Sequence, residues 1–430
     1  TVMGDEPMTF WWDFGGGATP NTSTERNPQV TLASAGNYEA FLRVDNAHGS
    51  DEFRFTLEVS PAGDGIYKVI SNVCTGSPSL AVVDGNPAVA YQALVGSSDW
   101  RVEYIRALDI TGSTWGPPVS PPYEPPAMLG DFVQLKVVGL VSPAPAIATT
   151  ERFMIEGGNL LFSIGSDPQG SSFKLYTFPY HFSIRPMPFS LMNVRSVAME
   201  VVFPALAVVE IIPNNLLFIT AMDEDGEQWN PPITVIEGIN LVSLCLSTVE
   251  AQFNPAICLS NASGLTYVRA KDSLGNSWGT PQQLTGGEIK SSSMALIGGK
   301  PAIAFADSGM LKYVYATDET GEGWSRIISV EGEITVDDGV ISLAEVNGFP
   351  AIAFYDRAET GYKVKYVIAQ DVNGGSWMRT NVAEPDRAKP VICLAEVAGR
   401  PAIVYAKWDS TELVYIRAND AMGTSWPSPR

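Results

Sequence analysis

Seven aspartates carry the most regular chemical pattern in the chain. Each is followed, after two intervening residues, by a glycine and, after two more, by a large aromatic residue, as in Asp109, Gly112 and Trp115. A carboxylate in such a turn can accept backbone N–H hydrogen bonds, bind calcium or act as an acid or base. Glycine supplies the positive φ that tight turns demand, and the aromatic ring can pack between sheets. We expect a structural turn motif at Asp109, Asp167, Asp223, Asp272, Asp318, Asp371 and Asp420.

A second group of residues lies in the segments expected to connect the second and third strands of each repeat. Aromatic rings flanked by carboxylates suit sugars, through stacking and hydrogen bonding, and carboxylates also suit calcium. Ordinary polar loop residues have the same composition, so that alternative stays open. The candidates for a ligand-binding face are Glu151, Arg152, Asp307, Tyr355, Asp356, Arg357, Trp408 and Asp409.

Few residues fit the familiar catalytic constellations. The chain has two histidines, His48 and His181, and no Gly-x-Ser-x-Gly, His-Glu-x-x-His, phosphate-loop or zinc-binding spacing. Paired carboxylates for glycoside hydrolysis remain an alternative because acidic residues are plentiful, although no spacing singles out one pair. The sequence therefore assigns no catalytic residue.

The elements that position these residues repeat along the chain. The aspartate motif recurs at intervals of 46 to 58 residues, and a Pro-Ala pair precedes each copy. About four short strand-like runs at this period predict one blade of a β-propeller. The last repeat ends too early for its outer strand, so residues 66–71 are expected to complete it. We expect an all-β fold with seven blades within residues 62–430, at about 73–122, 123–182, 183–236, 237–286, 287–331, 332–383 and 384–430.

The turn motif resembles the Asp box of sialidases and related propellers, with one residue more between Asp and Gly. Asp boxes lie on outer hairpins away from the sialidase active face, so the resemblance implies a folding role for the seven aspartates. A sialidase-like enzyme would also need an arginine triad and a tyrosine nucleophile. Ile184-Arg185-Pro186 is only a faint counterpart of that family's Phe-Arg-Ile-Pro segment.

The first 61 residues differ in kind from the repeats. They contain Trp11-Trp12-Asp13-Phe14-Gly15-Gly16-Gly17, Ala35-Gly36-Asn37-Tyr38 and Val44-Asp45-Asn46-Ala47-His48-Gly49-Ser50. These segments resemble the PKD domain, an extracellular immunoglobulin-like β-sandwich, with Gly16 and Ala35 in place of the family's Asp and Pro. The family has about twenty more residues before the Trp-Asp-Phe strand, and a missing edge strand can be supplied by another chain. We expect a sandwich without its first strands, either because the chain is a fragment or because a partner completes it.

Charge and cysteine content narrow the class of protein further. A net charge of −20 and a pI of about 4.5 disfavour nucleic acid and anionic lipid as partners and favour cations or basic partners. No run of eighteen apolar residues appears, so no membrane span is expected. Cys245 and Cys258 are expected to lie diagonally on neighbouring strands, which disfavours a bridge between them. Isolated buried thiols are expected at Cys74, Cys245, Cys258 and Cys393.

Two classes of function are compatible with these observations. The first is a non-enzymatic extracellular surface, adhesion or filament-associated protein, in which a PKD spacer presents a propeller for protein or glycan recognition. It is favoured by the missing catalytic groups and by the role of PKD domains as spacers or interaction units. The alternative is a carbohydrate-active enzyme, a glycoside hydrolase or lyase, with a propeller catalytic domain. In either case we expect the protein to be secreted. We expect no certain cofactor, and calcium is a candidate ligand. The incomplete sandwich could also allow copies of the chain to assemble with one another.

Overall fold

The fold class expected from the sequence is confirmed, because strands dominate and the described residues contain no helix. The chain divides into two compact units, Thr1–Asp64 and Gly65–Arg430, which are described separately. The structure, a computed structural model, describes residues 7–32, 36–59, 65–74, 78–95, 99–122, 128–138, 144–152, 160–178, 189–196, 201–242, 244–331, 341–358, 361–382, 388–407 and 410–427.

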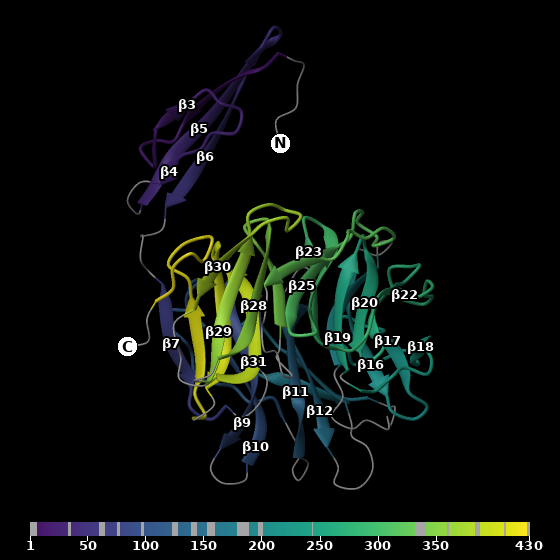
Figure 1. Ribbon diagram of the computed structural model, residues 1–430. Helices are drawn as coiled ribbons and strands as arrows, with labels where there is room; N and C mark the ends of the chain where they lie inside the picture. The colour runs from purple at the N-terminus through teal and green to yellow at the C-terminus, as the bar shows by residue number, and fades with distance from the viewer. Residues whose placement is uncertain are drawn as a thin grey trace. The chain divides into compact units, whose positions relative to one another are not determined.

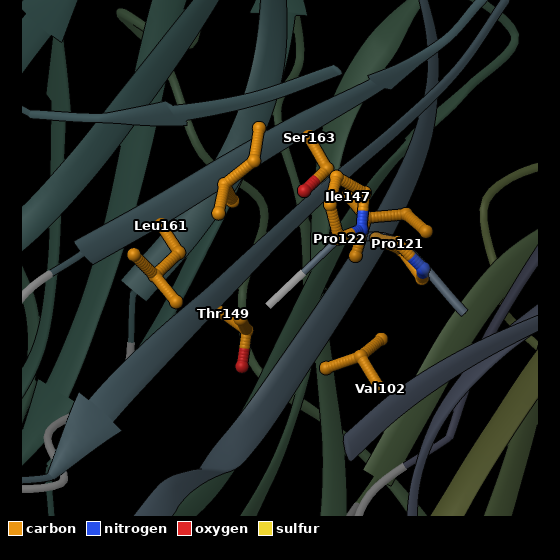
Figure 2. Close-up of a pocket in the computed structure, with 8 residues that line it drawn as sticks. Val102, Pro121, Pro122, Ile147, Thr149, Leu161 and Ser163 are labelled. Carbon is orange, nitrogen blue, oxygen red and sulfur yellow. The ribbon is translucent and has the colours of Figure 1, made fainter. Parts of the chain in front are cut away.

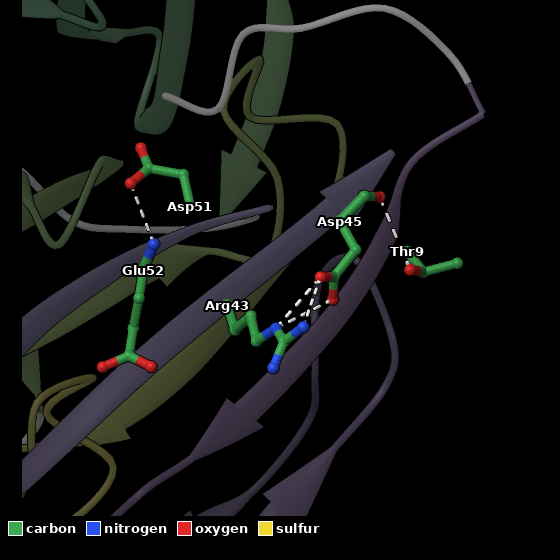
Figure 3. A network of polar contacts seen from close by, with 5 residues as sticks. All are labelled: Thr9, Arg43, Asp45, Asp51 and Glu52. Atoms are coloured by element: carbon green, nitrogen blue, oxygen red, sulfur yellow. Dashed lines mark hydrogen bonds and ion pairs between the residues drawn. The ribbon is translucent and has the colours of Figure 1, made fainter. Parts of the chain in front are cut away.

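The first unit contains one antiparallel sheet in the order β3-β1-β5-β6 and a two-stranded sheet of β2 and β4. Because side chains alternate along a strand, Phe10, Ala40 and Leu42 share the buried face of the larger sheet. On its other face the Arg43 guanidinium lies 2.8 Å from the Asp45 carboxylate (Figure 3). The strands are β1 (Thr9–Asp13), β2 (Ala18–Thr19), β3 (Thr22–Ser23), β4 (Thr31–Leu32), β5 (Gly36–Asn46) and β6 (Gly49–Val59).

The described residues of the second unit form seven antiparallel sheets. Within each sheet, strands that follow one another in the chain lie side by side from the inside outwards, apart from β7 in the last sheet. The first three sheets contain β8 (Ser79–Val83), β9 (Asn86–Val95) and β10 (Asp99–Arg106); β11 (Met128–Val138), β12 (Ala144–Arg152), β13 (Leu160–Gly165) and β14 (Phe173–Thr177); and β15 (Phe189–Ser196), β16 (Val201–Glu210), β17 (Asn215–Thr220) and β18 (Ile233–Ile236).

The next four sheets repeat this plan, and the last takes its outer strand from the start of the unit. They contain β19 (Cys245–Ala251), β20 (Asn254–Asn261), β21 (Gly264–Arg269) and β22 (Gln282–Gly286); β23 (Ile289–Ile297), β24 (Lys300–Asp307), β25 (Met310–Tyr315) and β26 (Ile328–Glu331); β27 (Ile341–Val346), β28 (Phe349–Ala358), β29 (Gly361–Ala369) and β30 (Trp377–Asn381); and β31 (Ala388–Val397), β32 (Arg400–Lys407), β33 (Leu413–Arg417) and β7 (Ile66–Ser71).

The sheets follow one another around a closed ring, which is the radial arrangement of a β-propeller. The first strand of each sheet contacts the first strand of the next, from β8 through β11, β15, β19, β23 and β27 to β31, and β31 contacts β8 again. Strand β7, drawn in blue, lies beside the yellow strands of the last sheet (Figure 1), and its Tyr67 is directly opposite Ile416 of β33. Both ends of the unit therefore contribute to one sheet, and β33 does not remain an open edge.

Hydrogen bonds join the innermost strands from sheet to sheet. A side chain of one sheet accepts the backbone N–H of the next, as in Leu135 N to Ser79 Oγ at 3.0 Å and Leu394 N to Ser342 Oγ at 2.9 Å. Between the last sheet and the first, Leu80 N donates to Cys393 Sγ at 3.4 Å. These bonds satisfy N–H groups that are costly to bury unpaired. The accepting side chains are Ser79, Gln134, Ser247, Ser291, Ser293, Ser342 and Cys393.

The first sheet departs from the expected four strands. It has three, and in place of a fourth strand Val119 forms an isolated bridge with Tyr104. The surrounding segment contains Pro117, Pro118, Pro121 and Pro122, and proline lacks the N–H that a ladder needs. The gap leaves a small, mostly apolar pocket (Figure 2), lined by Val102, Pro121, Pro122, Ile147, Thr149, Leu161, Ser163 and Leu175.

Candidate functional site

The turn aspartates accept hydrogen bonds within their own turns. At Asp109, Oδ1 accepts the N–H groups of Thr111 and Ser113 at 3.0 and 3.1 Å, and Oδ2 accepts the N–H of Thr114 at 2.8 Å. Equivalent bonds, to two or more residues of the turn, form at Asp223, Asp272, Asp318, Asp371 and Asp420, and Asp167 accepts the N–H of Ser171 at 3.0 Å.

These bonds favour the ionised carboxylate. Burial alone would raise the pKa of Asp318, but hydrogen bonds from the Thr320 hydroxyl and from the backbone of Gly323 outweigh it and lower the pKa to about 2. At Asp371 the backbone N–H of Gly375 is the largest cause, and the pKa is again lowered. A carboxylate whose pKa is lowered in this way cannot serve as a general acid near neutral pH.

The motif glycines are required by both conformation and space. Gly321 has φ of +76°, and a Cβ added there would lie 2.7 Å from the ring of Tyr267 in the preceding sheet. Gly275 has φ of +73°, and its added Cβ would lie 2.4 Å from the ring of Phe218. An L-residue at these positions would combine an unfavourable φ with a steric clash.

The motif aromatics connect each sheet to the one before it. In six copies the tryptophan Nε1–H donates to the carbonyl of its own motif glycine, as in Trp324 to Gly321 at 2.9 Å. Each ring packs edge to face on an aromatic from the third strand of the preceding sheet. The pairs, with centroids 5.0–5.4 Å apart, are Tyr104–Phe173, Phe162–Trp229, Phe218–Trp278, Tyr267–Trp324, Tyr313–Trp377, Tyr366–Trp426 and, across the ring closure, Tyr415–Trp115.

The carboxylates at the expected ligand-binding face form ion pairs with the neighbouring strand. Lys312 Nζ lies 2.5 Å from Asp307 Oδ2, and Lys365 contacts Asp356 in the same diagonal arrangement one sheet further on. The hydrogen bond from Lys312 is the largest cause of a lowered pKa at Asp307. In the last sheet the charges are reversed, with Lys407 Nζ 2.6 Å from Glu412 Oε2. These pairs stabilise the ends of the second and third strands, and the lowered pKa keeps Asp307 ionised at neutral pH.

The other candidates for this face are placed as follows. Tyr355 is 1% exposed and packs in the core between the last two sheets, so it cannot meet a ligand arriving from solvent. Glu151 and Arg152 end β12, and Arg357 lies near the end of β28. Trp408 and Asp409, together with His181 and Asp337-Asp338-Gly339, lie outside the described residues.

Among the described residues, no group of three or more His, Cys, Asp or Glu side chains is arranged to hold a metal ion.

Sequence reasoning missed a set of glutamates that lie between sheets. Glu345 Oε2 accepts the N–H of Gly298 at 2.5 Å and Glu396 Oε2 that of Asn347 at 2.6 Å, each from the inner turn of the preceding sheet. Glu250 has the same register, opposite a proline of its second strand. Burial raises the pKa of Glu250, and Arg195 acts in the opposite sense. In the sequence these glutamates could have been recognised because each precedes the proline of its Pro-Ala pair by five residues. They lie at the end of the ring opposite the one expected to bind ligand.

The cysteines show no redox or metal-binding arrangement among the described residues. None of the four forms a disulfide. Cys245 is opposite Ser260, and Cys258 is opposite Ser247, so the two thiols lie diagonally, as the sequence predicted. Burial raises the pKa of both Cys258 and Cys393, which keeps these thiols protonated and unreactive at neutral pH.

Comparisons with known proteins identify fold-level similarity only. No protein-family model and no curated protein matches the sequence. Among solved structures, NanB sialidase from Streptococcus pneumoniae has a TM-score of 0.42 at 11% identity, covering 89% of this chain and 83% of the sialidase. AofleA from Arthrobotrys oligospora has a TM-score of 0.46 at 11% identity, covering 75% and 91%. Aleuria aurantia lectin in complex with α-methyl-L-fucoside has a TM-score of 0.41 at 11% identity, covering 70% and 93%. These values assign neither a ligand nor an activity to this chain.

Proposed function

We propose that this chain is a non-enzymatic, extracellular recognition protein, in which a PKD-type domain carries a seven-bladed propeller that binds a protein or a glycan at a cell surface or matrix. The observation that carries the proposal is the commitment of its carboxylates to the fold. The turn aspartates bind backbone N–H groups, and Asp307 and Asp356 pair with lysines. The acidic net charge of −20 suits a soluble protein outside the cell and a partner with basic or neutral groups.

The ring end that carries these pairs supplies a varied polar rim. The position six residues after each Pro-Ala proline ends or nearly ends the second strand, and it differs from sheet to sheet. Such a rim, on a rigid ring, combines acidic, amide and basic groups, which suits recognition better than a repeated reaction. The residues at this position are Ala93, Glu151, Glu210, Asn261, Asp307, Asp356 and Lys407.

The enzymatic alternative requires a carboxyl group whose pKa is raised at the face. A glycosidase acid must be protonated near neutral pH, whereas the pKa of Asp307 is lowered. Glu250, whose pKa is raised, occupies the register of two glutamates that join neighbouring sheets. This direction of shift favours binding without bond cleavage.

A glycan array combined with a hydrolysis screen on the full chain tests the proposal. We expect binding of a glycan or of an immobilised matrix protein, weakened by Trp408→Ala or Arg357→Ala, without turnover of any bound glycan. Val372→Ala, at an exposed residue of an outer turn, serves as the control and should bind normally. Turnover that Asp307→Asn abolishes would overturn the non-enzymatic assignment, and no binding to either class of partner would remove the recognition role.

We further propose that self-assembly uses the first unit. Strand β6, eleven residues long, ends its sheet, and Phe53 on that strand is 67% exposed and stacked on Phe55. An open edge strand of this length is a template for another strand, and we place a second copy of the chain there. Light scattering should show concentration-dependent association that Phe53→Lys weakens and Val372→Lys does not. If both variants associate equally, the contact between copies does not involve Phe53.

A further inference from the structure

Lys136 occupies a position that is apolar in each of the other six sheets. It lies on the innermost strand β11, directly opposite Ala146. In every sheet the equivalent residue is likewise opposite an alanine of the second strand, so the register identifies the seven positions without ambiguity. The equivalents of Lys136 are Ala81, Met192, Val249, Ala295, Ala344 and Ala395.

The exposure of these residues locates them on the central channel. Their seven alanine partners on the second strands are 0% exposed, so no water reaches the sheets one strand further out. The innermost residues are nevertheless half-buried, except the buried Met192, and Lys136 itself is exposed. Because the first strands contact one another around the ring, we infer that these residues are exposed to a channel at its centre. Lys136 therefore extends into a channel whose wall at this level is apolar.

Within the described part of the chain, no carboxylate forms an ion pair or hydrogen bond with Lys136. Although Lys136 is exposed to this space, the surrounding atoms of the ring desolvate its ammonium group and lower its pKa, and the Cys393 thiol, whose own pKa is raised by burial, acts in the opposite sense. Several charged residues on strands packed against β11 have partners of their own. Arg101 pairs with Glu103, Arg106 donates to the Val83 carbonyl, and Arg195 acts on Glu250. Glu210 lies at the end of β16, opposite Asn215.

We propose that Lys136 forms a binding site for a small anion in the central channel, either a free inorganic ion or a carboxylate or sulfate group carried by a ligand. An ammonium group among apolar side chains gains most from a partner of opposite charge, and it offers three hydrogen-bond donors. The apolar wall supplies low polarity around the pair and strengthens the attraction. This inference is independent of the proposed function, because it concerns the channel and not the rim.

Chlorine NMR of chloride solutions containing the full chain tests the site. Bound chloride exchanging with free chloride broadens the signal, and we expect this broadening to be lost in Lys136→Met, which matches Met192 in shape and polarity. The control is Lys271→Met, which removes an exposed lysine from an outer turn and should leave the broadening unchanged. Broadening that persists in Lys136→Met would overturn the proposal.

Competition identifies the source of the anion. Sulfate and glucuronate should each restore a narrow signal, while glucose at the same concentration should not. Displacement by sulfate but not glucuronate would assign the site to free inorganic ions, and displacement by neither would overturn it. If Lys136→Met does not fold, a crystal of the unmodified chain soaked in bromide decides the question. Anomalous density beside Lys136 Nζ is the expected result, and none in the channel would contradict it.

Discussion

At the scale of single residues, the turn motif combines three requirements that the sequence pattern alone only suggests. Asp318 accepts N–H groups at both oxygens, Gly321 adopts positive φ against the ring of Tyr267, and Trp324 donates to the Gly321 carbonyl. Each residue type is chosen for a different reason, yet all three fix the same hairpin. Substitutions of Asp318 and of Gly321 therefore measure separately how hydrogen bonding and steric fit contribute to stability.

Asp318→Asn should reduce the free energy of unfolding by about 1–3 kcal/mol, because an amide cannot accept hydrogen bonds at both positions. Urea denaturation at neutral pH measures the loss, and Glu319→Gln, at the exposed neighbour, is the control. The folded pKa of about 2 lies below the ordinary value of 3.8, so this stability is present above pH 4 and is lost as the pH falls towards 2. The variant should therefore depend less on pH in that window. An equal acid dependence of variant and unmodified chain would contradict the role of Asp318.

Gly321→Ala should destabilise the fold more than Gly299→Ala. Both glycines have positive φ, +76° and +78°, but an added Cβ meets Tyr267 at Gly321 and nothing within 4 Å at Gly299. The control should lose about 1 kcal/mol from backbone strain alone, and the difference between the two variants measures the clash. Denaturation midpoints at constant m-value provide the comparison, and similar losses would mean that Tyr267 moves aside without cost.

At the scale of elements, hydrogen bonds to polar side chains, most of them serines, connect neighbouring innermost strands. Ser342→Ala removes the acceptor of Leu394 N–H and should cost about 1–2 kcal/mol, since a partly buried donor is left unpaired. Ser329→Ala, on the exposed outer strand β26, is the matched control and should be nearly neutral. A neutral Ser342→Ala measured by urea denaturation would show that water replaces the serine.

The positions of the strands and of the hairpin turns could be predicted from the sequence. The direction in which side chains of the inner strands point could not. The repeat of Asp, Gly and aromatic residues gives the outer hairpins because each residue acts within a few positions of its partner. Tyr355 was expected at the open face, but both faces of its strand are covered, so alternation carries no information there. Lys136 and Glu250 depend on contacts between sheets, which chain order does not specify. The prolines after Trp115 could have warned that the first sheet lacks a fourth strand.

At the scale of the whole molecule, the contacts described above form one continuous ring. Serines join the inner strands, aromatic pairs join the outer hairpins, and the last aromatic pair, Tyr415–Trp115, connects the end of the unit to its beginning. Strand β7 adds the outer strand of the last sheet, with Val69 opposite Val414. The recognition proposal depends on this closure, because a rim with fixed geometry requires that no sheet be free to separate.

Unfolding of two shortened chains tests the closure most directly. A chain beginning at residue 65 keeps β7 and should unfold in a single cooperative transition, with the stability of the intact second unit. A chain beginning at residue 72 lacks β7 and loses the packing of Tyr67, Val69 and Ile70, so it should lose at least about 3 kcal/mol. It should also lose cooperativity and aggregate through the exposed edge of β33. If the two chains unfold with the same midpoint and the same cooperativity in urea, β7 does not close the ring and the account is wrong.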